Sequence, residues 1–297
     1  MFIKKLSLFL SMQIEVIMYK HYWLNRFRIA RYIRRLFSKF ISRYKSNFVE
    51  IEGRKMFLDK YDSLKLSLYP YVEEQTNFFK KNIKKGDVVL DLGAHIGYFT
   101  CLFAQLVGKS GKVFAFEPEP NNFQLLKKNV EVNGYNHVVV EQKAVSNLNS
   151  TIKMYISNSP KDHRIYDTED DRESIEIESI TLDEYFKDFN QKIDFIKSNI
   201  QGADFAAFQG MKSIINKSKS NIVMALEYNP AMIKGFGSGN AEEFLDQLLV
   251  NDFKLYDLRW KEKIVPITKD KMMKLYNEEN KKGGFMLCIP LNSKVTI

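Results

Sequence analysis

The sequence has only two cysteines, Cys101 and Cys288, among 297 residues. Both lie in apolar runs, so we expect reduced thiols in a core rather than a disulfide. Neither a C-x-x-C nor an H-E-x-x-H pattern occurs in the sequence. We therefore predict no metal-ligating residues of these kinds, while metal dependence stays open.

The start of the chain lacks an uninterrupted hydrophobic run. Ser11, Gln13 and Glu15 break up its moderately apolar residues, and no small-residue cleavage site follows Lys4 and Lys5. Such a segment is too short and too polar to span a membrane, and it does not resemble a cleaved signal peptide. We predict a cytoplasmic protein.

Acidic side chains are almost missing from residues 1–46, which hold eleven Lys and Arg but only Glu15, for a net charge of +10. Because the whole chain carries +9, residues 47–297 sum to −1. Aromatic and aliphatic residues recur at helical spacing among the cations, which predicts a basic amphipathic helical arm. Such an arm binds a membrane surface, here the inner face, or packs on the body, a partner protein or a second copy. The near-neutral body argues against nucleic acid as a partner.

The fold is predicted around residues 86–100. The apolar run 88–90 is typical of a buried parallel strand. Asp91 ends this run, Gly93 and Gly97 follow, and a helical pattern begins one residue later. Gly93 allows a sharp turn that approaches a ligand, and Gly97 allows close packing of the helix. Ligands of open α/β sheets bind at such turns, outside the carboxyl ends of the strands.

A second strand, 113–116, ends at Glu117, twenty residues after Gly97. An acid at this place binds ribose hydroxyls in dinucleotide-binding folds. The glycine spacing is not G-x-G-x-x-G, which disfavours a nicotinamide enzyme. S-adenosylmethionine (SAM) fits this turn better than a dinucleotide, because it has a sulfonium and an amino-acid tail instead of a pyrophosphate. The alternative interpretation is an ordinary turn that binds no ligand. The predicted cofactor-binding residues are Asp91, Gly93, Ala94, His95, Gly97, Glu117 and Pro118, with Ala144 and Val145 beside the adenine.

The rest of the chain alternates strands and helices, which predicts one α/β domain over residues 47–297. Residues 47–70 are expected to form a β-hairpin. Further strands are predicted at 138–140, 152–156, 175–180, 193–196 and 222–226, and antiparallel closing strands at 253–258 and 285–289. Helices are predicted at 71–83, 98–107, 121–133, 203–215 and 241–250.

These motifs, in this order, resemble the FkbM family of SAM-dependent methyltransferases. The resemblance runs from about residue 55 to residue 290. It rests on residues 86–100, 115–118, 143–146, 162–166, 181–183, 193–197 and 201–204, and on Glu227 before Pro230. It implies a class I, Rossmann-like methyltransferase fold with a mostly parallel seven-stranded sheet and helices on both faces. It also implies methyl transfer to a hydroxyl of a sugar, a glycan or a small natural product.

The sequence departs from the family pattern at the end of its fourth strand. The family usually has lysine, a hydrophobic residue and aspartate; here Ser198 and Asn199 follow Lys197. Asparagine forms hydrogen bonds but cannot act as a carboxylate base, and it is a weaker ligand for hard metals. Two functions therefore remain open: an active O-methyltransferase, and a catalytically impaired SAM-binding or scaffold protein that acts through residues 1–46.

His163, Glu227 and Asn199 are the predicted catalytic residues. The ordinary pKa of histidine, about 6.5, suits a base near neutral pH, although a plain surface histidine is the alternative. Glu227 ends the fifth strand at the same sheet edge and is the second candidate for the base. Beside His163, Arg164 and Tyr166 are the predicted acceptor-binding residues, with Arg164 suited to an anionic acceptor.

Overall fold

The computed structural model describes residues 47–60, 62–67, 71–157, 163–166, 172–218, 221–237, 239–258, 264–280, 282–293 and 295. Clustering of the chain gives two compact units, Met1–Tyr71 and Val72–Ile297. The arm predicted for residues 1–46 lies outside the described residues. Among the residues that are described, no helix has the length and apolarity needed to cross a membrane.

In the first unit, strands β1 (Phe48–Ile51) and β2 (Arg54–Phe57) form an antiparallel hairpin. Glu52 and Gly53 connect them, both with positive φ, as a two-residue hairpin turn requires. A hairpin was predicted over residues 47–70; the strands of the observed hairpin cover only residues 48–57.

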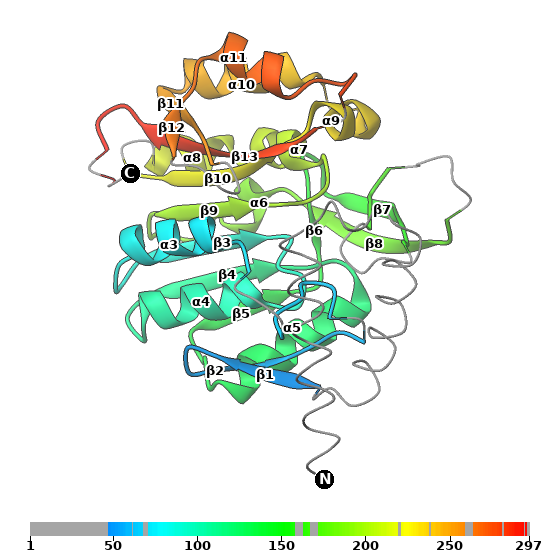
Figure 1. The fold of residues 1–297 in the computed structure, drawn as a ribbon, viewed down its shortest axis with the longest axis vertical. Coiled ribbons are helices and arrows are strands. Elements are labelled where there is room, and N and C mark those ends of the chain that lie inside the picture. Colours follow the sequence, from blue (N-terminus) through cyan, green and yellow to red (C-terminus); the bar gives the residue numbers. More distant parts are fainter. Residues whose placement is uncertain are drawn as a thin grey trace, which may run out of the picture. The chain divides into compact units, whose positions relative to one another are not determined.

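The second unit is built on an eight-stranded sheet of order β12-β11-β13-β10-β9-β3-β4-β5 (Figure 1). Its five parallel strands are β3 (Val88–Leu92), β4 (Lys112–Phe116), β5 (Val138–Glu141), β9 (Phe195–Ser198) and β10 (Val223–Tyr228). Strand β13 (Gly284–Pro290) pairs antiparallel with both β10 and β11 (Phe253–Asp257). The prediction of seven strands was one short: the two-residue β12 (Val265–Pro266) adds an eighth beside β11. A strand of two residues is too short to produce a periodic signal in the sequence.

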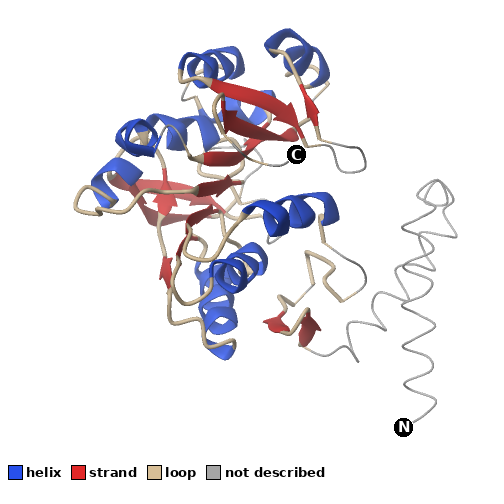
Figure 2. Cartoon of the chain, turned by 90° about the vertical axis from the view of Figure 1, so that its left-hand side faces the viewer, coloured by secondary structure: helices blue, strands red, loops and turns tan. Residues whose placement is uncertain are grey.

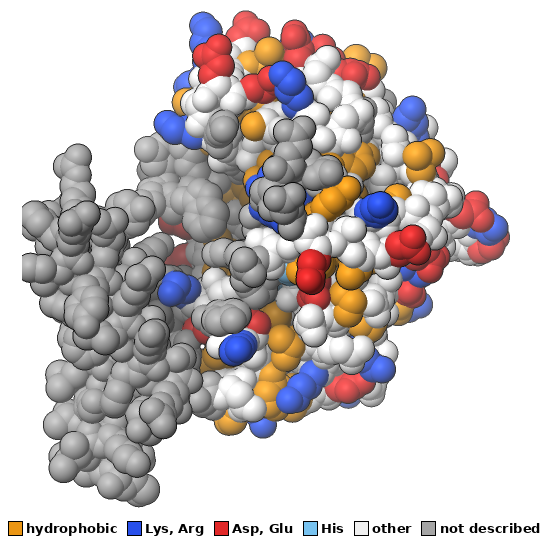
Figure 3. Space-filling model, turned by 90° about the vertical axis from the view of Figure 1, so that its right-hand side faces the viewer, with side chains coloured by type: hydrophobic (Ala, Val, Ile, Leu, Met, Phe, Trp, Pro, Cys, Tyr) orange, Lys and Arg blue, Asp and Glu red, His pale blue; other side chains and the backbone are white. Residues whose placement is uncertain are grey.

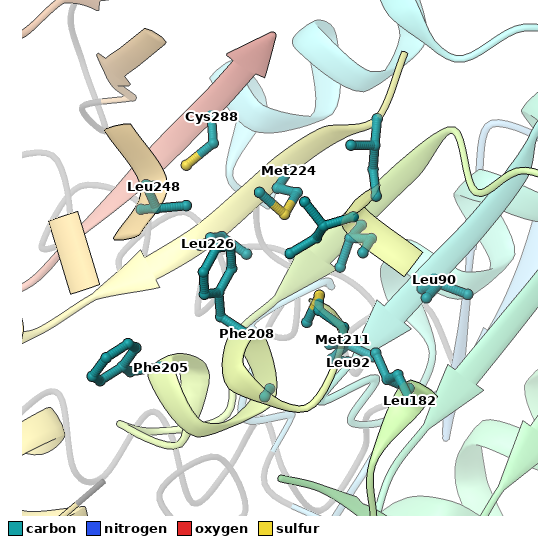
Figure 4. Packing of buried hydrophobic residues seen from close by; sticks show 14 of the residues in the cluster. Leu90, Leu92, Leu182, Phe205, Phe208, Met211, Met224, Leu226, Leu248 and Cys288 are labelled. Carbon is teal, nitrogen blue, oxygen red and sulfur yellow. The ribbon is translucent and has the colours of Figure 1, made fainter. Parts of the chain in front are cut away.

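Helices cover both faces of this sheet (Figure 2). On one face, aromatic contacts join Phe79 of α3 (Glu73–Asn82) to Phe99 and Phe103 of α4 (Tyr98–Val107), and α5 (Pro120–Val132) packs on α4. The other face carries the main hydrophobic core (Figure 4). Helices that contribute to it include α6 (Leu182–Tyr185), α7 (Asp204–Gln209), α8 (Lys212–Ser218) and α10 (Ala241–Val250).

Alternation along the central strands divides polar from apolar side chains. Leu90 and Leu92 of β3 point into the main core, whereas Asp91 points to the face covered by α3 and α4. All five residues of β3 are buried, as expected for a central parallel strand covered on both sides. Asp91 therefore lies on the opposite side of the sheet from the main core.

Two predicted elements differ from the structure, and two helices were not predicted. The single helix predicted at 203–215 is two helices, because the chain turns at Gly210, whose N–H is shared between the carbonyls of Ala206 and Ala207. The predicted strand 152–156 is β7 (Ser150–Tyr155), which belongs to a separate three-stranded sheet with β6 (Ala144–Val145) and β8 (Ser174–Ile180). Two short helices, α9 (Pro230–Phe236) and α11 (Lys269–Leu275), were not predicted.

The small sheet begins at the carboxyl edge of the main sheet, since β6 starts three residues after β5 ends. Arg164 forms a β-bridge with Tyr155 at the end of β7.

On the face drawn in Figure 3, acidic and basic side chains of the described residues are interspersed rather than gathered by sign. This agrees with the near-neutral charge of residues 47–297.

Candidate functional site

The turn after β3 is held against two neighbouring strands. The N–H groups of Gly93 and Ala94 both donate to the carbonyl of Phe116, at 3.0 Å each, at the end of β4. Gly93 has a φ of +73°, and a Cβ added there would lie 2.2 Å from the carbonyl oxygen of Asn199, after β9. Only glycine combines this φ with such a close approach. The carboxyl ends of β3, β4 and β9 therefore meet at one point.

Gly97 begins the helix that follows this turn. It has a φ of +88°, and an added Cβ would lie 2.8 Å from Cδ1 of Leu126 in α5. The close packing predicted at Gly97 is confirmed. Between the two glycines, His95 has a φ of +53°, a conformation that non-glycine residues adopt mainly where function or packing imposes it.

Asp91 is completely buried, and both of its carboxylate oxygens have partners. Lys197 Nζ donates to Asp91 Oδ1 at 2.9 Å, and Thr100 Oγ1 donates to Asp91 Oδ2 at 2.6 Å. Lys197 Nζ also donates to the carbonyls of Leu92 and Gly93, at 3.3 and 2.8 Å. In this geometry Asp91 positions Lys197 and the start of α4, so its contribution to the site is indirect.

Glu117 is buried at the end of β4, with its carboxylate directed at the glycine turn. The backbone N–H of His95 donates to Glu117 Oε2 at 2.8 Å, and that of Glu119 donates to Oε1 at 3.1 Å. Burial raises the pKa of Glu117 to about 7, and these two backbone donors oppose the increase. Pro118 beside it is half-buried. Sequence spacing predicted this juxtaposition of Glu117 with the turn, and the structure confirms it.

Ala144 and Val145, predicted to flank an adenine, form β6. Both are buried: Ala144 packs in a small cluster with Met154 and Ile177, and Val145 packs in the main core. They lie three to four residues after the end of β5, at the same carboxyl edge. Contact with an adenine remains a prediction.

The ends of β9 and β10 bring three polar side chains together. Gln201 Nε2 donates to Asn199 Oδ1 at 3.0 Å and reaches Oε2 of Glu227 at 3.5 Å. Glu227, near the end of β10, is half-buried. Burial and the negative charge of Asp204 raise the pKa of Glu227 to about 8; the N–H of Gln201 and the charges of Lys197 and Arg164 oppose the increase.

Residues 163–166 cross from the small sheet toward α9. Arg164 pairs through its backbone with Tyr155 of β7, and its Nη1 donates to the hydroxyl of Tyr166 at 3.0 Å. The Tyr166 ring packs on α9: a Cβ added to Gly235 would lie 2.7 Å from its Cε2, and Phe236 is in edge contact. Since Arg164 also acts electrostatically on Glu227, this segment belongs to the same site.

His163, the first candidate for the base, uses its Nδ1 to accept a hydrogen bond from the N–H of Ser157 at 3.0 Å. A neutral imidazole that accepts at Nδ1 carries its proton on Nε2. The Nδ1 lone pair is therefore engaged by the backbone in this conformation. A catalytic role for His163 remains a prediction.

Asp204 and Gln201 were not among the predicted site residues. Both follow β9 in the turn that leads into α7, and Asp204 is 1% exposed. A single carboxylate at the start of the apolar segment 203–208 was the signal in the sequence that could have identified Asp204.

The residues at this edge fit SAM. The two backbone donors orient the Glu117 carboxylate and leave lone pairs for two ribose hydroxyls. The positive charge of Lys197, which lies beside the turn, is neutralised by Asp91, so it does not oppose a sulfonium. A mostly parallel sheet with the antiparallel strand β13 inserted between β10 and β11, a glycine turn after β3 and an acid after β4 define a class I SAM-dependent methyltransferase.

Comparison with known proteins identifies the family. A family model described as the methyltransferase FkbM domain matches residues 91–255, more than half of the chain. The chain therefore belongs to the FkbM methyltransferase family, and its cofactor is S-adenosylmethionine.

More distant similarities are shorter. A protein-L-isoaspartate O-methyltransferase of Methanococcus maripaludis is 37% identical over 87 residues, 29% of this chain and 38% of that protein. The chain spans less than two fifths of the length of the curated relatives it matches. The structure of methyltransferase FkbM from Methylobacillus flagellatus is 16% identical, with a TM-score of 0.40 over 68% of this chain and 43% of that chain. Aeropyrum pernix fibrillarin with bound SAM is 10% identical, with a TM-score of 0.40 over 83% of each chain.

Proposed function

We propose that this protein is an O-methyltransferase that acts on a hydroxyl of a sugar, a glycan or a small natural product. The observation that supports the proposal is the carboxyl group of Glu227, which lies at the same sheet edge as the glycine turn and has a pKa raised to about 8. An alcohol needs a base near its oxygen during methyl transfer, and a base whose pKa lies close to the working pH is the most effective.

The residues divide the task as follows. Bound SAM supplies an electrophilic methyl group on its sulfonium. Glu117 holds the ribose hydroxyls, and the turn from Gly93 to Gly97 lies against the amino-acid tail. Glu227 takes the proton from the acceptor hydroxyl, while Arg164 and Tyr166 orient the acceptor. Holding the acceptor oxygen in line with the methyl carbon supplies much of the rate.

Arg164 favours an acceptor that carries an anionic group close to the methylated hydroxyl. Its guanidinium is held by the Tyr166 hydroxyl at 3.0 Å, and Tyr166 is itself fixed against α9. A guanidinium held in one orientation suits a carboxylate or phosphate, which it binds with two parallel hydrogen bonds. Sugar phosphates and uronic acids combine such a group with free hydroxyls.

The experiment measures binding and transfer in the same preparation. Calorimetry with SAM and with S-adenosylhomocysteine comes first, followed by transfer of a radiolabelled methyl group to a panel of neutral sugars, sugar phosphates and uronic acids. We expect micromolar SAM binding and label in an ether linkage. Glu227→Gln should lower transfer at least about a hundredfold and leave SAM affinity within about threefold. Label recovered on nitrogen or sulfur, or full activity of Glu227→Gln, contradicts the proposal.

A non-catalytic SAM-binding protein that acts through residues 1–46 is the second candidate. It is favoured by the amide pair Asn199–Gln201, since neither side chain can remove a proton. Binding of SAM without transfer to any acceptor would support it, and Asn199→Asp would then be compared with the parent. Transfer that appears only in this variant would assign the loss of activity to position 199.

A further inference from the structure

Asn199 lies between the glycine turn and the proposed base. It follows β9, which is hydrogen-bonded to β3 on one side and to β10 on the other. A Cβ added to Gly93 in the glycine turn would lie 2.2 Å from the carbonyl oxygen of Asn199. Ser198 pairs with Leu226 of β10, so the same register continued by one residue sets Asn199 beside Glu227. Asn199 therefore belongs to the part of the sheet edge where an acceptor must lie if Glu227 is its base.

The side chain of Asn199 is oriented by Gln201. Gln201 Nε2 donates to Asn199 Oδ1 at 3.0 Å and reaches Oε2 of Glu227 at 3.5 Å. In the form that acts as a base, Glu227 is an ionised carboxylate, which only accepts hydrogen bonds, so the amide nitrogen of Gln201 faces it. The same nitrogen takes the amide oxygen of Asn199. The two N–H bonds of Asn199 Nδ2 are then directed away from Gln201, toward another partner.

The backbone keeps Gln201 in this place. Its φ is +55°, a left-handed conformation that non-glycine residues adopt mainly where function or packing imposes it. Gly202, the next residue, has a φ of +95°, and a Cβ added there would lie 2.5 Å from the carbonyl oxygen of Met232 in α9. The turn after β9 is therefore packed against the backbone of α9. The residue with the unusual φ is also the one that joins Asn199 to Glu227, which indicates a role in the site.

We propose that Asn199, held by Gln201, is a specificity-determining residue that donates a hydrogen bond from Nδ2 to an anionic oxygen of the acceptor. This inference rests on the proposed function and deepens it, because it assigns the acid group of the acceptor, a carboxylate or a phosphate, to the end of β9. An aspartate at position 199 would repel that group, whereas asparagine carries no charge and supplies a donor. The amide pair then determines substrate choice and is no sign of lost activity.

The surrounding charge favours an anionic oxygen over a hydroxyl as the partner of Asn199. A hydrogen bond to an ionised acceptor group is roughly twice as strong as one to a neutral group. Arg164, which acts electrostatically on Glu227, brings a positive charge to the same edge. It was assigned to an anionic group on separate grounds, since its guanidinium is held by the hydroxyl of Tyr166. An acid group has enough oxygens to accept from both side chains.

The test measures the binding of two acids to the full-length protein with bound S-adenosylhomocysteine. Protein labelled with ¹⁵N is titrated with glucuronate and with glucose 6-phosphate, and the side-chain NH2 signal of Asn199 is assigned by its loss in Asn199→Asp. We expect this signal to move with at least one acid and to stay unchanged with glucose. Asn199→Asp, which keeps the shape but adds a charge, should weaken binding of that acid at least about tenfold by calorimetry.

Three further variants separate charge, donor and orientation. Asn147→Asp is the matched control: Asn147 is also half-buried and bound to a glutamine, with its Nδ2 donating to Gln209 Oε1 at 3.1 Å, but it follows β6. It undergoes the same change of charge and should keep the parent affinity for the acid. Asn199→Ala removes the donor without adding a charge, and Gln201→Met removes the group that orients it. Both should weaken binding, though less than Asn199→Asp, and they decide the matter if Asn199→Asp does not fold.

An Asn199 signal that neither acid moves overturns the inference, as does parent affinity for the acid in Asn199→Ala. Methyl transfer that appears only in Asn199→Asp contradicts it as well, because asparagine would then be a defect. Failure of the proposed function is separate: if Glu227→Gln retains methyl transfer, Glu227 is not the base. The binding of the acids is measured without transfer, so the two outcomes remain distinguishable.

Discussion

Lys197 and Asp91 form a buried ion pair that joins β9 to β3 next to the glycine turn. Their side chains are 6% and 0% exposed, and the remaining donors of Lys197 are taken by two backbone carbonyls. Pairs of this kind add little stability by themselves, but removal of one partner leaves an uncompensated buried charge. The pair therefore acts chiefly by fixing the relative positions of two strand ends.

We expect Lys197→Met to lower the free energy of unfolding by about 3–5 kcal/mol, because Asp91 is left charged and buried. Urea unfolding at pH 7 measures it. Lys187→Met is the matched control: its partner Glu184 lies 2.7 Å away, but both side chains are more than half exposed, so the midpoint should not move. Similar midpoints for the two variants would show that the Lys197 charge is not needed for stability.

Glu117 gives SAM binding a predictable dependence on pH. Its pKa of about 7 in the folded protein lies above the 4.5 of an unperturbed glutamate, so the carboxyl stays protonated until neutral pH. The same shift lowers stability as pH rises from about 4.5 to about 7, since the folded protein binds the extra proton. The ionised form accepts from two ribose hydroxyls, so ligand binding draws the proton off.

S-adenosylhomocysteine should accordingly bind about tenfold more tightly at pH 8 than at pH 6. Calorimetry at pH 6, 7 and 8 measures this, and Glu117→Gln should bind at least tenfold more weakly with a flat profile. Glu119→Gln removes a negative charge beside Glu117, so the pH profile of this variant should lie at lower pH than that of the parent. A parent profile as flat as that of Glu117→Gln would remove Glu117 from the ribose site.

Among the elements, the turn between β3 and α4 controls the site. Gly93 brings the end of β3 against the backbone of Asn199, after β9, and its N–H ties the turn to β4. Three strand ends depend on this one close approach. The turn is therefore sensitive to any side chain added at Gly93.

Gly93→Ala should abolish SAM binding and lower the unfolding midpoint, since its Cβ would lie 2.2 Å from Asn199 O. Gly86→Ala is the matched control: Gly86 also has a positive φ, +93°, but its nearest atom would be 3.8 Å from the new Cβ. Gly86→Ala introduces similar backbone strain but no steric clash, so this variant should keep its affinity for SAM. Equal loss of binding in both variants would assign the effect to strain alone.

On the scale of the whole molecule, charge is divided unequally along the chain. Residues 1–46 carry +10 and the other 251 residues carry −1. Each cation close to an anionic leaflet contributes about 1 kcal/mol, so an arm of this composition suits a membrane surface. We propose that it holds the enzyme beside an acceptor on or near the inner face of a membrane; docking on a partner protein or a second copy is the alternative.

Flotation of the full chain with vesicles tests this proposal. The parent should float with vesicles containing phosphatidylserine, and less so with neutral phosphatidylcholine vesicles or in high salt. Replacement of Arg34, Arg35, Lys39 and Arg43 by Glu should abolish flotation without changing SAM binding. Equal flotation of parent and variant would leave a protein partner as the role of the arm.

Local features of the site follow from the sequence by itself. The β3 turn, Glu117 and the helix start at Tyr98 lie within a single strand–turn–helix–strand unit. Their geometry is set by neighbours in the chain and by the rule that parallel strands end at one edge. For the same reason Glu227 was predicted at this edge before the structure was known.

The contacts between distant segments needed the tertiary structure. Lys197 and Asp91 are 106 residues apart, and nothing in their local sequences states that β9 lies beside β3. The same holds for β6, whose pairing with β8 forms the small sheet. Short elements such as β12 and α9 are likewise held by tertiary contacts, because two to seven residues are too few for a periodic pattern. Sequence thus determined the cofactor and the sheet edge that binds it, whereas strand pairing decided which charges face one another there, since register is a property of two chain segments rather than of either alone.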